Sequence, residues 1–247
     1  MRLDNYLVEK GFFDSRTKAK QAIERGEIFI NGKCIEKSSF EVNELSNPVI
    51  EIKAEKLFVS LGGYKLQKSL EDFNFDCSNL VVADIGASTG GFTDCLLKNG
   101  AKKVFAVDLN DQLLHSSLKN DNRVKSVIKN ARELTRNDFD SKLDLIVADL
   151  SFISITLVLE VFANLLDDGK NLIVLIKPQF ETGIKKRFKN GIIRDEKLRK
   201  DACKKVFDYA KGLNLSPNKI TTAPLSDNKN VEYLMLFTKN GQSNLEI

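Results

Sequence analysis

The sequence is poor in the residues that build metal centres and disulfide frameworks. His115 is its only histidine, and its four cysteines form no CxxC pair: Cys34, Cys77, Cys95 and Cys203. A zinc site or a disulfide network is therefore not expected, and scattered reduced thiols are typical of the cytoplasm. The most apolar stretch, residues 143–166, is interrupted by three acidic residues, and the N-terminus has no apolar core. We therefore expect neither a membrane span nor a signal peptide.

The length of the chain limits the number of domains it can form, and its charge indicates what kind of partner it could bind. Its 247 residues exceed one simple fold and fall short of two full-sized ones, which favours one sizeable domain plus a small module. Hydrophobic residues make up 42% of the chain and charged residues 29%, so there is enough apolar material for a core. The net charge of +4 hints at a polyanionic partner but is too small to establish one.

The first 45 residues have the pattern of a small α+β module. Apolar residues at helical spacing predict one helix over residues 3–11 and a second over residues 15–26. Two short β-like segments then flank Asn31 and Gly32, a dipeptide that strongly favours a two-residue hairpin turn. Two helices followed by a hairpin are enough to fill a small module.

The rest of the chain alternates between apolar strands and amphipathic helices. Strands are expected over residues 80–85, 103–109, 124–128, 143–150, 171–177, 219–223 and 231–237, and helices over 92–98, 154–166 and 196–211. This alternation predicts a doubly wound, Rossmann-like α/β domain with a mainly parallel sheet over residues 59–247, behind a module over residues 1–58. Ligands of such sheets bind beyond the C-terminal ends of the strands.

A glycine-rich loop follows the first strand of the predicted domain. Gly86, Gly90 and Gly91 allow a sharp turn and a close approach of the backbone to a ligand. The next strand ends in Asp108, which is placed to accept both hydroxyls of a ribose. The loop lacks the GxGxxG pattern of NAD-binding domains and the GK[ST] ending of a P-loop, and Asp84 suits an amino group better than phosphates. We therefore predict S-adenosyl-L-methionine as the cofactor.

Charged residues also close two later strands of the predicted sheet. Asp149 ends the fourth strand and Lys177 the fifth, where Pro178 cannot continue a central strand. Both side chains are expected at the sheet edge that carries the glycine-rich loop. Burial and neighbouring charges can tune a lysine at such a position towards its neutral form. An acid and a lysine facing each other beside a cofactor loop favour a catalytic site.

The N-terminal segment RLDNYLVEKGFFDSRTKAKQAIERGEIFINGKCIEKSSFEV is similar, nearly throughout, to the S-four-like RNA-binding domain. Domains of this kind grip folded RNA through its backbone. The resemblance implies phosphate contacts at the matching basic positions: Arg2, Arg16, Lys20 and Lys37. Residues 1–60 contain ten basic and ten acidic side chains, so RNA binding requires a basic patch on one side of the module.

A series of motifs follows that module in this order: SLGGYKL, ADIGASTGGFTD, AVDLN, NAR, ADLSFIS, IKPQFE and NVEYL. They resemble the TlyA family of ribosomal RNA 2′-O-methyltransferases, whose catalytic domain is related to FtsJ-type enzymes. The resemblance implies a catalytic tetrad: Lys65, Asp149, Lys177 and Glu232. It also implies cofactor contacts at the matching positions: Asp84, Gly86, Ala87, Ser88, Thr89, Gly90, Gly91, Phe92, Asp108, Asn130, Ala131 and Arg132. Leu61 and Lys229 depart from the family pattern.

The implied tetrad suits the chemistry of a ribose hydroxyl. A 2′-hydroxyl is protonated at neutral pH, so the site must remove its proton as the oxygen attacks. We expect Lys177 to accept this proton, tuned by Asp149 and Glu232, with Lys65 orienting the hydroxyl or stabilising the developing alkoxide. No metal is required.

A basic stretch surrounds the last predicted catalytic lysine. Residues 177–211 carry twelve basic and five acidic side chains, a net charge of +7, while the remaining residues sum to −3. This stretch could follow an RNA backbone, although a solvated helix with pairs such as Glu196–Lys200 is the alternative. Four RNA contacts are predicted in it: Lys185, Lys186, Arg187 and Lys189. Phe180 or Phe188 is a candidate for stacking a base.

Other functions compete with this interpretation. Relatives in the TlyA family have carried a haemolysin label, but no segment here has the dimensions for membrane insertion. A non-catalytic RNA-binding assembly factor is opposed by the intact tetrad, and a dehydrogenase would bind NAD instead. The family suggests a cytidine 2′-hydroxyl, and a chain that begins at RLD resembles the shorter type that acts on 23S rRNA only. The expected partner is ribosomal RNA or a ribosomal subunit, and a monomer is favoured.

Overall fold

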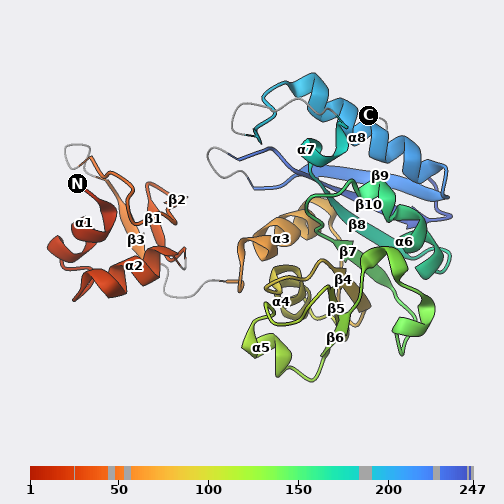
Figure 1. Ribbon diagram of the computed structural model, residues 1–247, viewed down its shortest axis with the longest axis horizontal. Coiled ribbons are helices and arrows are strands. Elements are labelled where there is room, and N and C mark those ends of the chain that lie inside the picture. Colours follow the sequence, from red (N-terminus) through yellow and green to blue (C-terminus); the bar gives the residue numbers. More distant parts are fainter. Residues whose placement is uncertain are drawn as a thin grey trace. The chain divides into compact units, whose positions relative to one another are not determined.

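The computed structural model describes residues 1–24, 26–43, 48–52, 57–183, 191–224, 229–243 and 245. The chain divides into two compact units, Met1–Leu57 and Phe58–Ile247 (Figure 1). Each unit has a hydrophobic core of its own.

The N-terminal unit combines two helices with a three-stranded antiparallel sheet. Its elements are α1 (Leu3–Glu9), α2 (Arg16–Glu24), β1 (Ile28–Ile30), β2 (Lys33–Cys34) and β3 (Ile50–Ile52). The central strand β1 pairs with β2 on one side and with β3 on the other. The turn between β1 and β2 places Asn31 at φ 50° and Gly32 at φ 77°, the left-handed region that a two-residue hairpin requires. The predicted hairpin is therefore present.

Apolar residues at helical spacing form the core of this unit. Leu3 and Leu7 of α1 meet Ala19 and Ile23 of α2, and all four are fully buried against the sheet residue Ile28. The same spacing that predicted the two helices therefore also supplies their packing face.

The C-terminal unit contains the remaining elements. They are α3 (Leu61–Phe73), β4 (Val81–Ile85), α4 (Gly91–Lys98), β5 (Lys103–Asp108), α5 (Ser116–Lys119), β6 (Val124–Ile128), β7 (Leu145–Ala148), α6 (Leu159–Leu165), β8 (Asn171–Ile176), α7 (Pro178–Glu181), α8 (Glu196–Lys211), β9 (Leu215–Thr222) and β10 (Tyr233–Lys239). Three 3-10 turns join them: η2 (Ala131–Glu133), η3 (Arg136–Asp138) and η4 (Ile155–Leu157). None of the helices in the described ranges has the length and apolar character that crossing a membrane requires.

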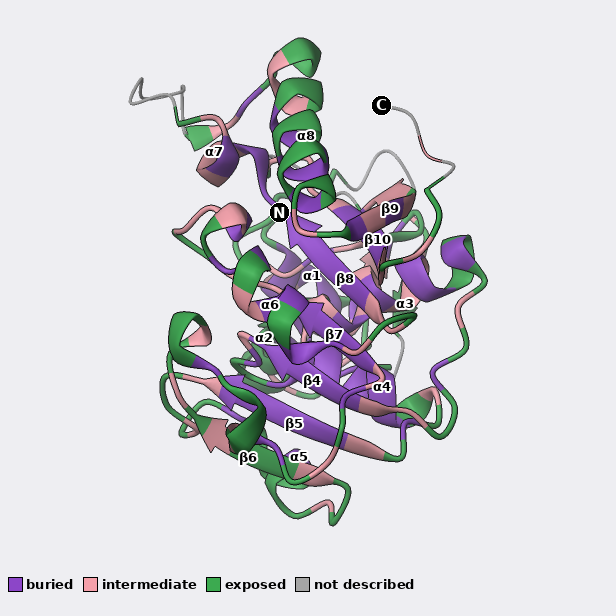
Figure 2. Ribbon diagram, turned by 90° about the vertical axis from the view of Figure 1, so that its right-hand side faces the viewer, coloured by how far each residue is buried: buried purple, intermediate pink, exposed green. Residues whose placement is uncertain are grey.

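The seven strands form one sheet in the order β6-β5-β4-β7-β8-β10-β9. The first five strands in this order are parallel, and β10 runs antiparallel to β8 and β9. Figure 2 shows the middle strands buried along most of their length and β6 at the exposed edge. The predicted doubly wound α/β fold with a mainly parallel sheet is confirmed.

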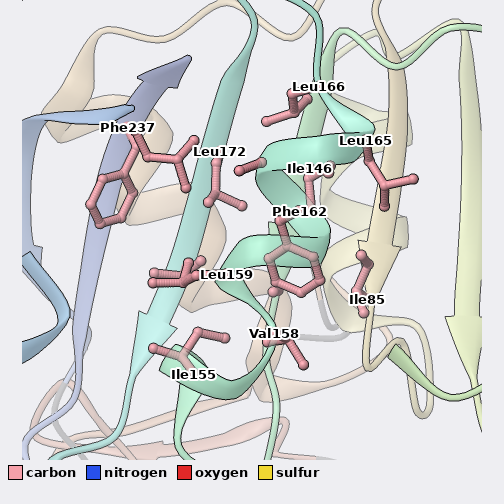
Figure 3. Packing of buried hydrophobic residues seen from close by; sticks show 14 of the residues in the cluster. Ile85, Ile146, Ile155, Val158, Leu159, Phe162, Leu165, Leu166, Leu172 and Phe237 are labelled. Atoms are coloured by element: carbon pink, nitrogen blue, oxygen red, sulfur yellow. The ribbon is translucent and has the colours of Figure 1, made fainter. Parts of the chain in front are cut away.

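Both faces of the sheet are covered, as successive residues of β8 show. Leu172 and Val174 belong to a core cluster that includes residues of α6 and α8, whereas Ile173 and Leu175 belong to a second cluster with α3 and α4. Alternate residues of a strand point to opposite faces, so a strand in a two-faced sheet is apolar at every position. Figure 3 shows Phe162 of α6 packed among the strand residues of the first cluster.

Three helices lie where the sequence pattern predicted none: α3 before β4, α5 between β5 and β6, and α7 after β8. Leu66, Leu70 and Phe73 of α3 are buried at helical spacing, but two glycines in its first turn weaken the helical signal. The helix expected over residues 154–166 is also divided, because η4 forms first and α6 begins only at Leu159.

Replacement of Phe162 tests the first core cluster. Phe162 is fully buried, so Phe162→Ala should lower the free energy of unfolding by about 3–5 kcal/mol, measured by denaturant titration. Leu157→Ala is the matched control because Leu157 is 56% exposed, and it should change stability by less than about 1 kcal/mol. Equal losses in the two variants would contradict the core assignment.

Candidate active site

The glycine-rich loop between β4 and α4 packs closely against two other segments of the chain, the end of β7 and the start of α3. Gly86 has φ 86°, and a Cβ at this position would lie 2.5 Å from the carbonyl oxygen of Asp149 at the end of β7. A Cβ on Gly91, the first residue of α4, would lie 2.2 Å from Oγ of Ser60 and 2.9 Å from the backbone nitrogen of Gly63. The loop, the start of α3 and the end of β7 therefore meet at one place.

Asp84 is a buried carboxylate with one unsatisfied oxygen. It is fully buried in β4, and Thr93 donates a hydrogen bond of 2.6 Å from Oγ1 to its Oδ2. Its Oδ1 has no hydrogen-bond partner within the described part of the chain. Burial raises the pKa of Asp84 to about 7, and the nearby carboxylates of Asp149 and Asp108 act in the same direction. A buried acceptor without a donor fits a cationic group of a ligand.

Asp108 closes β5 at the wall of a small pocket. Its Oδ2 accepts a hydrogen bond of 2.8 Å from the backbone N–H of Ser88, and its Oδ1 accepts one of 2.7 Å from Leu109. The residues that line the pocket come from the glycine-rich loop and from the region where β5 and β6 end: Ala87, Ser88, Ala106, Asp108, Asn110, Asp111, Leu114, Ser126, Val127 and Ile128. Three of these were predicted from the sequence, Ala87, Ser88 and Asp108.

The other pocket residues were missed because the cofactor prediction relied on motif positions. Asn110, Asp111 and Leu114 follow β5, and residues 126–128 end β6. The rule that ligands bind beyond the C-terminal strand ends would have pointed to both segments.

Three further residues that were predicted to contact the cofactor, Thr89, Gly90 and Phe92, fix the conformation of the loop and of the helix that follows it. Gly90 is the N-cap of α4, with φ 91°. The carbonyl of Thr89 accepts a hydrogen bond of 3.2 Å from the backbone N–H of His115, which ties the loop to the segment before α5. Phe92 is buried in the core cluster that includes α3 and α4.

The predicted segment Asn130 to Arg132 lies just beyond β6. The Asn130 side chain caps η2 by accepting a hydrogen bond of 3.0 Å from the backbone N–H of Arg132. The backbone N–H of Lys129 donates to the carbonyl of Asp108 over 2.9 Å, so the segment is attached next to the end of β5. None of the three predicted residues lines the pocket described above.

Lys177 and Asp149 form an ion pair at the ends of neighbouring strands. Lys177 Nζ lies 2.5 Å from Oδ1 of Asp149 and donates a hydrogen bond of 2.8 Å to Oγ of Ser151. Only 8% of Lys177 is exposed. Its strand, β8, ends one residue earlier and α7 begins at Pro178, as the proline predicts.

Lys65 and Glu232 form a second ion pair, in which Nζ lies 2.6 Å from Oε2. Glu232 directly precedes Tyr233, the first residue of β10, which pairs with Ile176 of β8. Because Lys177 follows Ile176 on the antiparallel neighbour, Glu232 and Lys177 lie side by side at the strand ends. The four predicted catalytic residues are thus brought together as two ion pairs at one edge of the sheet.

In the N-terminal unit, two predicted RNA contacts converge on the buried carboxylate of Asp4. Arg2 donates to it through Nε and Nη2, each over 3.0 Å, and Arg16 donates through Nη2 over 2.9 Å. The guanidinium of Arg2, followed by that of Arg16, holds the pKa of Asp4 well below its usual range. The arginine side chains remain 43% and 61% exposed, so both present part of their surface to solvent.

The other predicted RNA contacts lie at the surface or outside the described residues. Lys20 Nζ lies 3.6 Å from Oε1 of Glu24 on the same helix, and Lys37 is exposed. Five residues of the basic stretch fall outside the described ranges: Lys185, Lys186, Arg187, Phe188 and Lys189. The anticipated pair on α8 is present, with Lys200 Nζ 3.0 Å from Oε1 of Glu196.

Comparison with known proteins assigns both units. The S4 domain matches residues 1–44, and the FtsJ-like methyltransferase matches residues 58–240. The chain belongs to the FtsJ-like methyltransferase family. The resemblance inferred from the sequence motifs is therefore confirmed.

Three curated relatives of this FtsJ-like methyltransferase match over nearly the whole chain. Hemolysin A of Brachyspira hyodysenteriae is 40% identical over 96% of this chain and 99% of that protein. The 16S/23S rRNA (cytidine-2′-O)-methyltransferase TlyA of Mycobacterium tuberculosis is 35% identical over 95% of this chain and 88% of that protein. The 23S rRNA (cytidine-2′-O)-methyltransferase TlyA of Campylobacter jejuni is 34% identical over 97% and 100%. The similarity to the two proteins named TlyA therefore extends over both units of this chain.

S-adenosyl-L-methionine is the cofactor of this FtsJ-like methyltransferase. The residues present fit it, because the orphaned Oδ1 of Asp84 suits a cationic amino group and the Asp108 carboxylate stands at the pocket wall. The close approach of Gly86 to Asp149 also keeps the loop free of side chains at that point. The alternative of an NAD-dependent dehydrogenase is excluded.

Asp84 makes the stability of the cofactor-free protein depend on pH. Its folded-state pKa of about 7 lies above the ordinary aspartate value, so the folded state binds more protons than the unfolded state between those pKa values. The free energy of unfolding should therefore fall as pH rises from 4 to 7, by at most about 4 kcal/mol from this group.

Asp84→Asn should remove this dependence. Without cofactor, the variant should gain melting temperature over the wild type at pH 8 and lose that advantage at pH 4.5, measured by thermal unfolding. Asp201→Asn, at an exposed aspartate of α8, is the control. A difference between wild type and Asp84→Asn that does not change with pH would contradict the raised pKa.

Proposed function

We propose that this FtsJ-like methyltransferase transfers a methyl group to the 2′-hydroxyl of a cytidine in ribosomal RNA. The observation that carries the proposal is Lys177, a buried lysine held by Asp149 and Ser151 at the sheet edge where the cofactor loop also lies. The relatives from Mycobacterium tuberculosis and Campylobacter jejuni are named for this reaction, which supports the same chemistry here.

The proposed chemistry needs a proton acceptor beside the ribose. A ribose hydroxyl is a weak nucleophile until its proton is removed, and a well-placed base contributes to the rate. In this proposal Lys177 accepts the proton, and Asp149 and Ser151 hold the resulting ammonium in the geometry described above. The pair of Lys65 and Glu232 orients the hydroxyl and stabilises the negative charge that develops on its oxygen.

The cofactor supplies an electrophilic methyl group on its sulfonium when it is bound. Asp84 would hold the amino group of the cofactor and Asp108 its ribose hydroxyls, while Gly86 and Gly91 let the loop backbone approach. The segment Asn130 to Arg132 would contact the adenine side. Positioning the hydroxyl in line with the methyl group then accounts for much of the catalysis.

The N-terminal unit provides the proposed grip on RNA. Arg2 and Arg16 are fixed in place by Asp4 yet remain partly exposed, so their orientation is set before RNA binds. Lys20 and Lys37 add positive charge at the surface of the same unit. Guanidinium groups bind phosphate oxygens in a forked geometry, which suits contacts to an RNA backbone. We propose 23S rRNA as the target because both relatives named above include it.

Lys177→Ala should strongly reduce the rate of methyl transfer while cofactor binding persists. The expected loss in kcat is about 10²–10⁴-fold, because a general base is removed. In cells that lack the gene, the wild-type protein should restore a cytidine 2′-O-methyl group in 23S rRNA and the variant should not, measured by methylation mapping. Lys142→Ala, at an exposed lysine that precedes β7 and lies outside the basic stretch, is the control. Near-normal turnover of Lys177→Ala with intact cofactor binding would show that another group is the base.

Lys20→Ala/Lys37→Ala should weaken binding to ribosomal RNA by removing phosphate contacts. The slope of log affinity against log salt should decrease in magnitude by about 1–2, since each phosphate contact releases close to one counterion. Filter binding at several salt concentrations measures both quantities. Lys102→Ala/Lys142→Ala is the charge-matched control, because both lysines are exposed and precede β5 and β7, at the opposite strand ends from Asp108 and Asp149. An unchanged slope would exclude these two lysines from the RNA interface.

A further inference from the structure

One buried carboxylate beside the catalytic strand ends has no part in the proposed chemistry. Glu181, the last residue of α7, lies four residues after Lys177 and is only 2% exposed. Burial raises its pKa above the ordinary glutamate value, so an ionised carboxylate at this place needs strong donors. The groups that donate hydrogen bonds to Glu181 therefore show which segment of the chain this carboxylate fixes in place.

Among the described residues, the donors to the Glu181 carboxylate belong to the segment that follows Asp149. Oγ of Ser154 donates to Oε2 over 2.5 Å, and the backbone N–H of Ile155 donates to Oε1 over 2.8 Å. Ser154 is also the N-cap of η4, because its hydroxyl accepts a hydrogen bond from the backbone N–H of Thr156. The carboxylate thus holds the far end of the loop that begins at Asp149.

The segments 149–155 and 177–181 are consequently joined at both ends. At one end Lys177 contacts Asp149 and Ser151, and at the other Glu181 contacts the start of η4. Between these attachments the rings of Phe152 and Phe180 lie 5.5 Å apart at an interplanar angle of 48°. The two segments are therefore attached to each other at two points, one at the catalytic lysine and one at Glu181.

The backbone between the two attachments is strained. Phe152 has φ 67°, in the left-handed region that a residue with a bulky side chain rarely adopts, and its side chain is 87% exposed. Burial of its ring therefore does not compensate for the strain. The attachments on either side of Phe152 keep it in place, and release of one of them would let the loop relax.

We propose that Glu181 is a positioning residue for methyl transfer, which holds Asp149 and Ser151 against Lys177 by fixing the other end of their loop. This inference rests on the proposed function, in which Lys177 takes the hydroxyl proton. Glu181 itself does not touch the reacting atoms. A small displacement of the groups that orient a catalytic lysine lowers the rate without removing any binding contact.

A second contact makes the inference testable in the folded protein. Lys205 of α8 donates a hydrogen bond of 2.8 Å to the backbone carbonyl of Glu181, not to its carboxylate. α7 therefore stays attached to α8 when the Glu181 side chain is replaced. Pro178, buried at the start of α7, is also unaffected by such a change.

The experiment compares three variants of the full chain with the wild type. Glu181→Ala removes both hydrogen bonds, Ser154→Ala removes one of them, and Glu181→Gln keeps an oxygen that can accept from Ile155. We expect kcat for methyl transfer to rRNA to fall about 10–100-fold in Glu181→Ala and less in Ser154→Ala, with recovery to within about threefold of wild type in Glu181→Gln. The KM values for rRNA and S-adenosyl-L-methionine should stay within about twofold. Glu160→Ala, at an exposed glutamate of α6, should behave as wild type.

Two results would overturn the inference. One is a parallel loss of cofactor affinity and kcat in all three variants, which indicates a purely structural role. The other is a crystal structure of Glu181→Ala in which Asp149 and Ser151 keep their contacts with Lys177. That structure decides the matter independently of activity, whereas a wild-type protein that transfers no methyl group to rRNA would contradict the proposed function instead.

Discussion

The close approach of Gly86 to the backbone of Asp149 is the contact on which the active site depends. Because no Cβ fits between them, the cofactor loop packs directly against the end of β7. The same strand end carries the carboxylate that pairs with Lys177. Gly91 packs against Ser60 in a similar way, and this contact brings the start of α3 to the loop. Two glycine contacts thus unite the cofactor loop with the elements that carry the catalytic residues.

Different partners give the carboxylates at this edge different chemistry. Asp149 has a lysine beside it, whereas Asp84 accepts from Thr93 and, among the described residues, its Oδ1 has no hydrogen-bond partner. Burial without a protein cation explains why the pKa of Asp84 rises to about 7. A carboxylate without its own cation can accept one from a ligand, while a carboxylate with a lysine can stabilise that lysine after proton transfer. The arrangement separates cofactor binding from proton transfer.

Local patterns predicted the elements that have strong local signals. The Asn31-Gly32 hairpin and the apolar parallel strands are examples, because turn geometry and burial on two faces act directly on neighbouring residues. The strand Ile50–Ile52 joins β1 in the N-terminal sheet, and nothing in its own three residues specifies that partner. Helix α3 was missed because two glycines in its first turn obscure the spacing of its buried residues. The pocket residues that follow β5 and those that end β6 come together only through the strand order.

The sequence alone determined the chemical groups of this methyltransferase: the glycine-rich loop, the acids and lysines at strand ends, and the basic residues of the N-terminal unit. Only the tertiary structure decided how these groups pair, because the partners are far apart along the chain. Lys65 on α3 pairs with Glu232, which directly precedes β10. Arg2 and Arg16 both donate to Asp4. Glu181 accepts a hydrogen bond from Ser154, in the loop that follows Asp149. The spacing of residues along a chain predicts on which face of a helix or strand a side chain lies. The packing of separate elements determines which side chain it contacts on that face.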